Sequence, residues 1–163
     1  MKLREVTIED ALFLFEIKQD KEFQKYLPNM LTPKNLDEQI KEIKDVIKLS
    51  KKEQGYYFII EEKNERIGFV DIYKINKKHK RCSVGYGIAK KHWKKGHATK
   101  ALRLALIKIK KLNFHTIEAT TNPKNIASKK ILEKNGFTKI GLMKDYYYSN
   151  NKYVDRILYW KVL

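Results

Sequence analysis

The chain has 163 residues, of which 42% are hydrophobic and 12% aromatic, so it can bury a core and is not expected to be disordered. It has no apolar leader and no run near the roughly 18 apolar residues of a membrane span. Cys82 is the only cysteine, which excludes an internal disulfide and a thiol-rich zinc cluster. We expect a single domain over residues 1–163 that is cytoplasmic and binds neither metal nor membrane.

The formal net charge of +17 raises nucleic acid as a partner, because clustered cations bind phosphate by releasing counterions. Of the 36 basic residues, however, only five are arginines, whereas proteins that read phosphates and base edges favour the guanidinium fork. We interpret the charge as a lysine-rich bias over a solvated surface and do not expect nucleic acid as a specific ligand. A selected nucleic-acid surface is the alternative.

The first part of the chain predicts two helices. Thr7 or Asp10 can cap a helix whose apolar residues recur at helical spacing over 11–17. Thr32 and Pro33 predict the start of the second helix, as N-cap and first helical residue. The residues of that helix expected to face the core are Leu36, Ile40, Ile43 and Ile47.

Strands are predicted next. Residues 56–61 and 67–75 are rich in β-branched and aromatic side chains and flank a turn, which indicates a hairpin. Residues 81–89 predict a third strand. Within it, Gly85 and Gly87 stand where a bulge or a close approach to the backbone is expected.

The second half alternates helices and strands. A long helix is expected over 98–112, where the apolar residues form one stripe, and a strand over 116–121. A short helix is expected over 125–134, followed by strands over 137–142 and 155–162. This order, with one long crossover helix, predicts a three-layer α/β sandwich.

The segment WKKGHAT, residues 93–99, precedes the long helix and has the features of a phosphate site. The first N–H groups of a helix have no internal partner, and the helix dipole adds positive charge there. Gly96 and Ala98 keep side chains away from that backbone, while Lys94 and Lys95 add charge. Since a glycine before a helix also occurs in ordinary turns, the segment alone leaves both interpretations open.

Read with the rest of the sequence, this segment resembles the acetyl-CoA loop of the GNAT (GCN5-related N-acetyltransferase) superfamily, which reads Q/R-x-x-G-x-G/A. Trp93-x-x-Gly96-x-Ala98 is similar to it, with Trp93 at the Q/R position. An aromatic residue there is usual in the RimJ/RimL branch of the superfamily.

Two downstream segments also resemble the RimJ/RimL branch. Asn125-x-x-Ser128, followed by EKNGF at 133–137, is similar to the branch's N-x-x-S and E-K-x-G-F run. Residues 148–155 resemble its closing hairpin. The three motifs occur in the right order, each on the expected element, and the resemblance covers nearly the whole chain.

The resemblance implies a GNAT-type three-layer α/β/α sandwich. Its central sheet would be mixed and mostly antiparallel, with a bulged, splayed strand pair that binds acetyl-CoA as co-substrate. The cofactor-binding residues implied are Trp93, Lys94, Lys95, Gly96, His97, Ala98, Thr99, Asn125 and Ser128. Backbone N–H groups of 95–99 would hold the pyrophosphate, and pantetheine would lie between the Gly85 and Thr116 strands, hydrogen-bonded by Asn125. A plain helix cap is the alternative for Asn125.

Chemistry in this family is direct attack of a neutral amine on the thioester, which requires a base for the amine and an acid for the sulfur. Many relatives carry Glu at the position of Ser83, so we expect Glu118 on the next strand to act as base. A surface Glu paired with lysine is the alternative. Ser128 matches the position thought to protonate the thiolate, with an ordinary helix serine as the alternative. Tyrosines 146–148 are other candidate donors, and Cys82 is expected to be an inert filler.

The expected function is transfer of acetyl to a primary amine, preferably the α-amino group of a ribosomal protein. An α-amino group has a pKa near 8 and a lysine one near 10.4, so a lysine-directed site would have to recover roughly 3.4 kcal/mol. Aminosugars, amino acids, polyamines and antibiotics stay open as acceptors. A silent acyl-CoA-binding domain and an RNA- or ribosome-binding module are the rival classes.

The acceptor groove is expected around residues 20–35 and 143–155, and the oligomeric state, including a homodimer, is left open.

Overall fold

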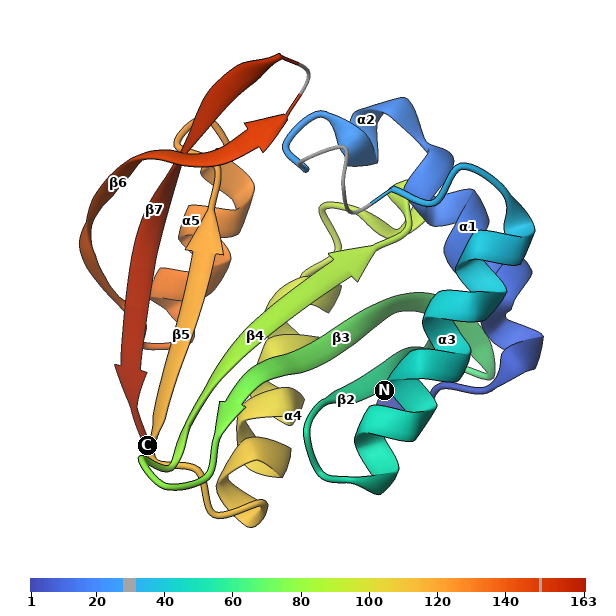
Figure 1. Ribbon diagram of the computed structural model, residues 1–163, viewed down its shortest axis with the longest axis horizontal. Helices are drawn as coiled ribbons and strands as arrows, with labels where there is room; N and C mark the ends of the chain where they lie inside the picture. The colour runs from blue at the N-terminus through green and yellow to red at the C-terminus, as the bar shows by residue number, and fades with distance from the viewer. Residues whose placement is uncertain (28–31, 150) are drawn as a thin grey trace.

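The computed structural model describes residues 1–27, 32–149 and 151–163. Within them, one sheet has the strand order β1-β2-β3-β4-β5-β7-β6 (Figure 1). The strands are β1 (Lys2–Glu5), β2 (Tyr56–Glu62), β3 (Glu65–Asn76), β4 (Arg81–Ile88), β5 (Thr116–Thr121), β6 (Thr138–Ser149) and β7 (Lys152–Val162). Neighbouring strands are antiparallel except β4 and β5, which are parallel.

Helices cover both faces of this sheet. The α-helices are α1 (Ala11–Gln19), α2 (Lys21–Gln24), α3 (Leu36–Lys51), α4 (His97–Lys111) and α5 (Ile126–Lys134), and the short 3-10 turns are η1 (Ile8–Asp10) and η3 (Lys90–His92). The apolar stripe of α4, which includes Leu102 and Ile109, packs with Val70 of β3 into the larger core. On the opposite face, Leu14 of α1 and Ile43 of α3 pack against β2. The predicted three-layer sandwich with a mixed, mostly antiparallel sheet is confirmed.

The predicted start of the second long helix was wrong. The helix α3 begins at Leu36, and its N-cap is Asn35, whose side chain accepts a hydrogen bond from the Glu38 backbone N–H. Thr32 and Pro33 therefore precede the helix. Asn35 is the N-cap in place of Thr32 because its short side-chain amide accepts a hydrogen bond directly from a backbone N–H of the first turn. Leu36, at the exposed edge of that turn, keeps 37% of its surface accessible and does not face the core as predicted.

Other differences concern short or paired elements. The strand β1 and the one-turn helix α2 were not predicted, because four residues carry too little periodicity. The strands β6 and β7 are longer than the predicted 137–142 and 155–162. They pair along most of their length, and this pairing orders the tyrosine-rich segment. Asn150, part of the predicted closing hairpin, lies outside the described residues.

Of the two alternatives predicted at Gly85 and Gly87, a bulge or a close approach to the backbone, the structure shows the close approach and no bulge. Pairing between β3 and β4 is regular from Gly68↔Ile88 to Tyr73↔Ser83, and the register shifts only beyond Tyr73. The two glycines instead allow close approach of side chains from β3. A Cβ on Gly87 would lie 2.6 Å from Phe69, and one on Gly85 would overlap the Asp71 carboxylate.

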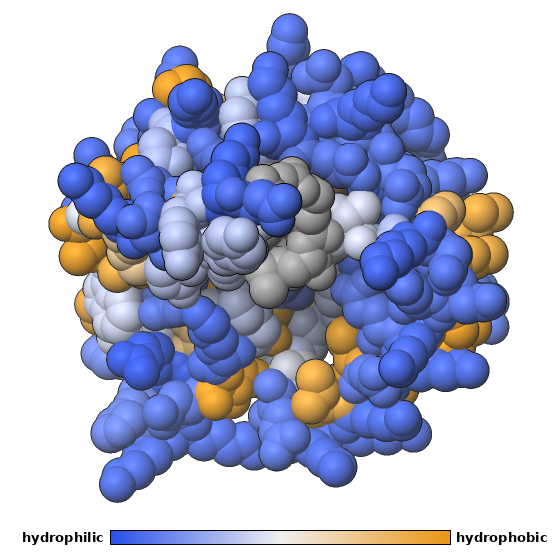
Figure 2. Space-filling model, turned by 45° about the horizontal axis from the view of Figure 1, so that its top comes forward, coloured by the Kyte–Doolittle hydropathy of each residue, from blue (hydrophilic) through white to orange (hydrophobic). Residues whose placement is uncertain are grey.

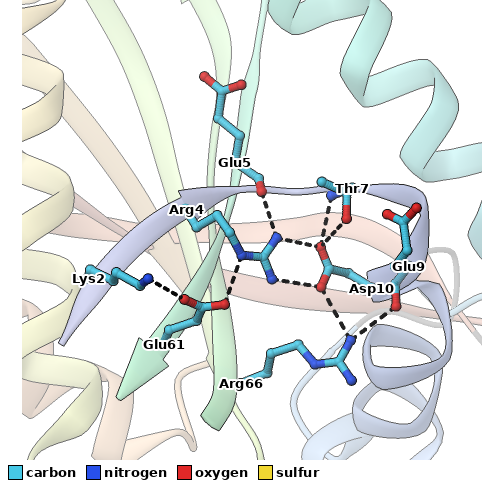
Figure 3. Close-up of polar contacts among 8 residues, drawn as sticks. All are labelled: Lys2, Arg4, Glu5, Thr7, Glu9, Asp10, Glu61 and Arg66. Carbon is cyan, nitrogen blue, oxygen red and sulfur yellow. Dashed lines mark hydrogen bonds and ion pairs between the residues drawn. The ribbon is translucent and has the colours of Figure 1, made fainter. Parts of the chain in front are cut away.

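A network of ion pairs fastens the N-terminal segment to the sheet (Figure 3). Arg4 of β1 contacts Asp10 through Nη1 and Nη2, both at 2.9 Å, and Glu61 of β2 through Nε at 2.8 Å. Arg66 of β3 reaches the same Asp10 at 3.4 Å. Burial acts to raise the pKa of Asp10, but hydrogen bonds from Arg4, Thr7 and Arg66 outweigh it and hold that pKa below 3.8. We assign this network to structure, since its members do not line the cavity described below.

No helix in the described ranges is long and apolar enough to cross a membrane.

Candidate active site

The strands β4 and β5 diverge, and the sheet opens between them. They pair only over Arg81↔Thr116, Cys82↔Ile117 and Ser83↔Glu118, after which β5 follows β7 and β4 follows β3. Figure 1 shows the resulting V, with its mouth toward α2 and the β6–β7 hairpin. The predicted splayed strand pair is therefore confirmed, although β4 carries no bulge at its glycines.

A cavity of about 600 Å³ fills this opening. It is lined on the α5 side by Asn125, Ser128 and Leu132, and on the α1–α3 side by Lys18 and Glu42. Val84, Gly85 and Tyr86 of β4 and 119–122 at the end of β5 form the walls between them. Figure 2 shows the surface hollowed between the left and right halves of the molecule, with hydrophobic residues beside the hollow. The opening thus joins the two faces of the sheet, and groups held on opposite faces can meet there.

The segment before α4 forms a tight turn with exposed backbone. Gly96 is the N-cap of α4 and has φ +76°, and no side chain caps this helix. A Cβ on Gly96 would meet no atom within 4 Å, so the space beside it is open. The first N–H groups of α4 are thus left for an external anion. Lys94 and Lys95 are exposed on this turn.

Trp93 has a structural role in this turn. Its indole Nε1 donates a hydrogen bond to the Ile88 carbonyl at 2.6 Å, and its ring packs against the larger core. This contact ties the turn to the end of β4. His97 packs edge-on against His92, with ring centroids 6.0 Å apart. The side chains at 93 and 97 therefore shape the turn, while its glycine and helical amides stay accessible.

Glu118 lies at the fork of the V, at the last paired position of β4 and β5. Ser83 Oγ donates a hydrogen bond to Glu118 Oε1 at 2.8 Å, and Lys74 Nζ lies 3.9 Å from the same oxygen. Ile117 and Ala119 are buried toward α4, so Glu118 and Thr120 point to the opposite face, as strand alternation predicted. The Glu118 carboxylate thus lies beside the cavity, whose lining begins one residue later.

Ser128 and Asn125 lie together at the start of α5. The Asn125 side chain caps this helix by accepting from the Ser128 backbone N–H at 3.0 Å. The Tyr86 hydroxyl lies 3.1 Å from Ser128 Oγ, so a strand hydroxyl and a helix hydroxyl meet inside the cavity. Burial raises the pKa of Tyr86, although the Ser128 hydrogen bond acts against this. Tyr86 was not singled out from the sequence, because only the fold brings it to Ser128.

Asp71 is a buried carboxylate of the cavity lining that sequence reasoning missed. It belongs to β3 and lies against Gly85, which leaves room for it. Burial raises the pKa of Asp71 to about 6, and Lys18 offsets this only in part. The pattern GFVDIY gave no signal beyond a strand. Its proximity to the glycine of the neighbouring strand follows from the β3–β4 register alone.

The remaining candidates from the sequence lie in different surroundings. Cys82 is fully buried, and its burial raises the pKa of the thiol to about 12, as expected for an inert filler. Tyr147 lines the cavity, Tyr146 accepts a hydrogen bond from Lys74 at 3.0 Å, and Tyr148 is 61% exposed. In the described part of the chain, His, Cys, Asp and Glu side chains do not gather in groups of three or more that could hold a metal ion.

The cavity that crosses the opened sheet and the uncapped start of α4 both match the motifs found in the sequence. The family model described as acetyltransferase (GNAT) domain matches residues 1–138. The chain belongs to the GNAT acetyltransferase family. It is an N-acetyltransferase, and acetyl-CoA is its co-substrate.

Relatives of this GNAT enzyme match it over nearly their whole length. It is 32% identical to the uncharacterized N-acetyltransferase p20 of Bacillus licheniformis, over 95% of this chain and 88% of that one. It is 29% identical to the uncharacterized N-acetyltransferase YoaA of Bacillus subtilis (strain 168), over 96% and 90% of the two chains.

Solved structures of the RimJ/RimL type have the same fold. RimL, a ribosomal L7/L12 alpha-N-protein acetyltransferase in complex with coenzyme A, superimposes with a TM-score of 0.89 at 20% identity, over 99% of this chain and 93% of that one. Mycobacterium smegmatis RimJ in complex with a CoA-disulfide gives 0.89 at 23% identity, over 98% and 80%. The predicted resemblance to RimJ/RimL enzymes is thereby confirmed at the level of the fold.

Proposed function

We propose that this GNAT enzyme transfers acetyl from acetyl-CoA to the α-amino group of a protein, with a ribosomal protein as the favoured acceptor. The observation that carries the proposal is the cavity that passes between β4 and β5 and is lined from both faces of the sheet. Such a passage lets a thioester held along the α4–α5 side meet an amine held on the α1–α3 side. A buried, two-sided site favours direct transfer, because both reactants are positioned together.

In this proposal the backbone N–H groups of 95–99 bind the pyrophosphate, with Lys94 and Lys95 adding charge. The pantetheine arm would then enter the gap between β4 and β5, where Asn125 lies at its edge. Because Asn125 Oδ1 is occupied by capping α5, its amide NH₂ is the group left to contact the arm.

The proposed chemistry uses one polar pair beside the cavity, Ser83 and Glu118, and one inside it, Tyr86 and Ser128. Glu118, held by Ser83, takes a proton from the ammonium or from a bridging water, and the neutral amine attacks the thioester carbon. The carbon–sulfur bond then breaks, and Ser128 or its neighbour Tyr86 hydrogen-bonds or protonates the leaving thiolate.

Two arguments support an α-amino acceptor. An α-amino group is neutral in roughly one molecule in ten at pH 7, far more often than a lysine, so a single carboxylate suffices as base. The RimL and RimJ structures share the fold, and the RimL enzyme is an alpha-N-protein acetyltransferase. Small amines are the alternative acceptors and belong in the same assay.

The test is a thiol-release assay with acetyl-CoA and a panel of N-terminal peptides, amino acids, aminoglycosides and polyamines. We expect peptides with a free α-amino group to support turnover and α-N-acetylated peptides with a free lysine to be poor acceptors. In Ser128→Ala, kcat is expected to fall by about 10- to 100-fold with little change in the KM of acetyl-CoA, which would tie turnover to this cavity. Turnover confined to polyamines or aminoglycosides would contradict the α-amino proposal.

A further inference from the structure

Arg156 is a buried cation inside the cavity that the proposed chemistry does not use. It lies on β7 with only 6% of its surface exposed, and its side chain lines the cavity. Nη1 donates a hydrogen bond to the Tyr26 carbonyl at 3.1 Å, and the guanidinium lies 5.5 Å from the centre of the Tyr147 ring. Nε is buried and has no hydrogen-bond partner. The Arg156 guanidinium therefore contacts a carbonyl and an aromatic face, and it can still donate further hydrogen bonds, including one from Nε.

No carboxylate compensates this charge. In the parts of the chain that the structure describes, Arg156 forms no ion pair, and the residues outside them, 28–31 and 150, include no Asp or Glu. Arg4 and Arg66, both more exposed, share Asp10. A buried cation is costly unless it is paired, so the unpaired and buried Arg156, unlike Arg4 and Arg66, is suited to bind an external anion.

The opposite wall of the cavity carries negative charge. Asp71 lies on β3, and Glu42 of α3 forms an ion pair with Lys18 at 2.7 Å, which neutralises the other cation of the lining. Since β4 and β5 stand between β3 and β7 in the sheet, the carboxylate and the guanidinium face the cavity from its two sides. This arrangement complements a molecule with an ammonium at one end and an anion at the other.

We infer that the acceptor carries an oxyanion, most simply a carboxylate, a few bonds from its amine, and that Arg156 binds it. The inference rests on the proposed function, in which this cavity holds the acceptor. Two sources share this chemistry: an acidic side chain within the first residues of a protein N-terminus, and the α-carboxylate of a free amino acid. Polyamines, which bring only positive charge, are disfavoured by the same residue.

The experiment compares acceptors that differ only in one anion. One pair is a Ser-Asp-Ala-Ala peptide amide and its Ser-Asn-Ala-Ala counterpart, and the other is alanine and alaninamide. We expect wild-type kcat/KM to favour the anionic member of at least one pair by roughly 10- to 100-fold, the range for a hydrogen bond to a charged group. The pair that shows the preference identifies the source of the anion.

Variants then separate recognition from a structural role. In Arg156→Gln the anionic acceptor is expected to lose far more kcat/KM than the neutral one, so that the preference falls to about one. Arg156→Lys should retain part of the preference, because it keeps the charge. Arg103→Gln, an exposed arginine of α4 outside the cavity, is the matched control and should behave as wild type.

Two results would overturn the inference. One is a wild-type enzyme that treats both members of both pairs alike, and the other is an equal loss for both members in Arg156→Gln, which indicates that Arg156 only fastens Tyr26. If no amine supports turnover, the proposed function fails separately. The N-acetylated forms of the same pairs are then titrated into the protein by calorimetry, with and without CoA, and equal affinities would still refute the anion site.

Discussion

At the scale of single residues, the informative contact is the hydrogen bond from Ser83 to Glu118. By the family resemblance, Ser83 stands where many relatives carry the base, and Glu118 is its partner on the adjacent strand. In the proposed chemistry the carboxylate that acts as base therefore lies on the next strand, at the fork of the V. The hydrogen bond from Ser83 orients the Glu118 carboxylate, as a base that must reach the acceptor amine requires.

From this we predict that Glu118→Gln lowers kcat by about 10²- to 10⁴-fold at neutral pH, the usual loss for a positioned base. The loss should shrink as pH rises past the pKa of the acceptor, because the amine is then already neutral. Ser83→Ala keeps the carboxylate and is expected to have a smaller effect. A pH–rate profile of Glu118→Gln that matches the wild type in shape and height would mean that water alone removes the proton.

Among the residues of the candidate active site, sequence reasoning found some and missed others, and the reason is physical. Ser128 and Asn125 share one short helix and a fixed spacing, so a motif finds them. Asp71, Tyr86 and Arg156 reach the cavity only through strand register and the packing of distant segments. Their local sequence shows ordinary strand residues, and nothing in its periodicity separates a side chain that faces a cavity from one that faces a packed helix.

At the scale of elements, the turn before α4 determines whether the helix start can receive a ligand. Gly96 has φ +76°, a conformation that side-chain-bearing residues adopt at a cost of roughly 1–2 kcal/mol. Asn125 caps α5 with its side chain, whereas α4 has no such cap. The two helix starts therefore differ in the availability of their first N–H groups.

We predict that Gly96→Val weakens acetyl-CoA binding more than tenfold in a protein that remains folded, because the new side chain occupies the space where the pyrophosphate would approach. Gly136→Val is the matched control, since Gly136 also has φ +76° and its Cβ would meet only the mobile end of Lys161. Calorimetric titration with acetyl-CoA measures both variants. Equal loss of affinity in the two would attribute the effect to backbone strain and remove the turn from the cofactor site.

The elements themselves were predictable where one signal dominated. The strand β5 was predicted with its observed bounds, and α4 within one residue at each end, because alternation and a helical stripe are strong in those segments. The start of α3 was missed because two plausible caps compete three residues apart, and only the hydrogen bond from the Glu38 N–H to Asn35 decides between them.

At the scale of the whole molecule, stability depends on a few buried charges in a chain of high positive charge. The Asp10 carboxylate is 2% exposed and bridges Arg4 and Arg66, so it joins β1, η1 and β3. Its folded-state pKa lies below 3.8, so the stability it supplies is fully present above that value and is lost as pH falls through the folded pKa. Part of the acid sensitivity of the fold thus resides in one side chain.

Accordingly, Asp10→Asn is expected to lower the free energy of unfolding by roughly 2–3 kcal/mol at pH 7. The difference from wild type should narrow as pH falls below 3.8, because the unfolded chain then binds a proton that the folded Asp10 carboxylate, with its lowered pKa, does not yet bind. Urea unfolding of both proteins at several pH values measures this difference in unfolding free energy. The control is Asp45→Asn, whose ion pair with Lys48 is exposed on both sides and should contribute under about 1 kcal/mol. If the difference in unfolding free energy between Asp10→Asn and wild type stayed constant down to pH 3, the charge of Asp10 would be ruled out as the cause of that difference.

The divergence of β4 and β5 also bears on how the free enzyme avoids aggregation. Beyond Ser83 and Glu118, each of these strands has one edge without a neighbouring strand, and such edges recruit strands from other chains. Here the two bare edges face each other across the V instead of lying at the margin of the sheet. A foreign strand would have to enter between them, past α2 and the β6–β7 hairpin. In the proposed binding mode a slender chain with its own amide groups, pantetheine, occupies that space, so the same divergence that would admit the co-substrate keeps these two inner edges away from strands of other copies.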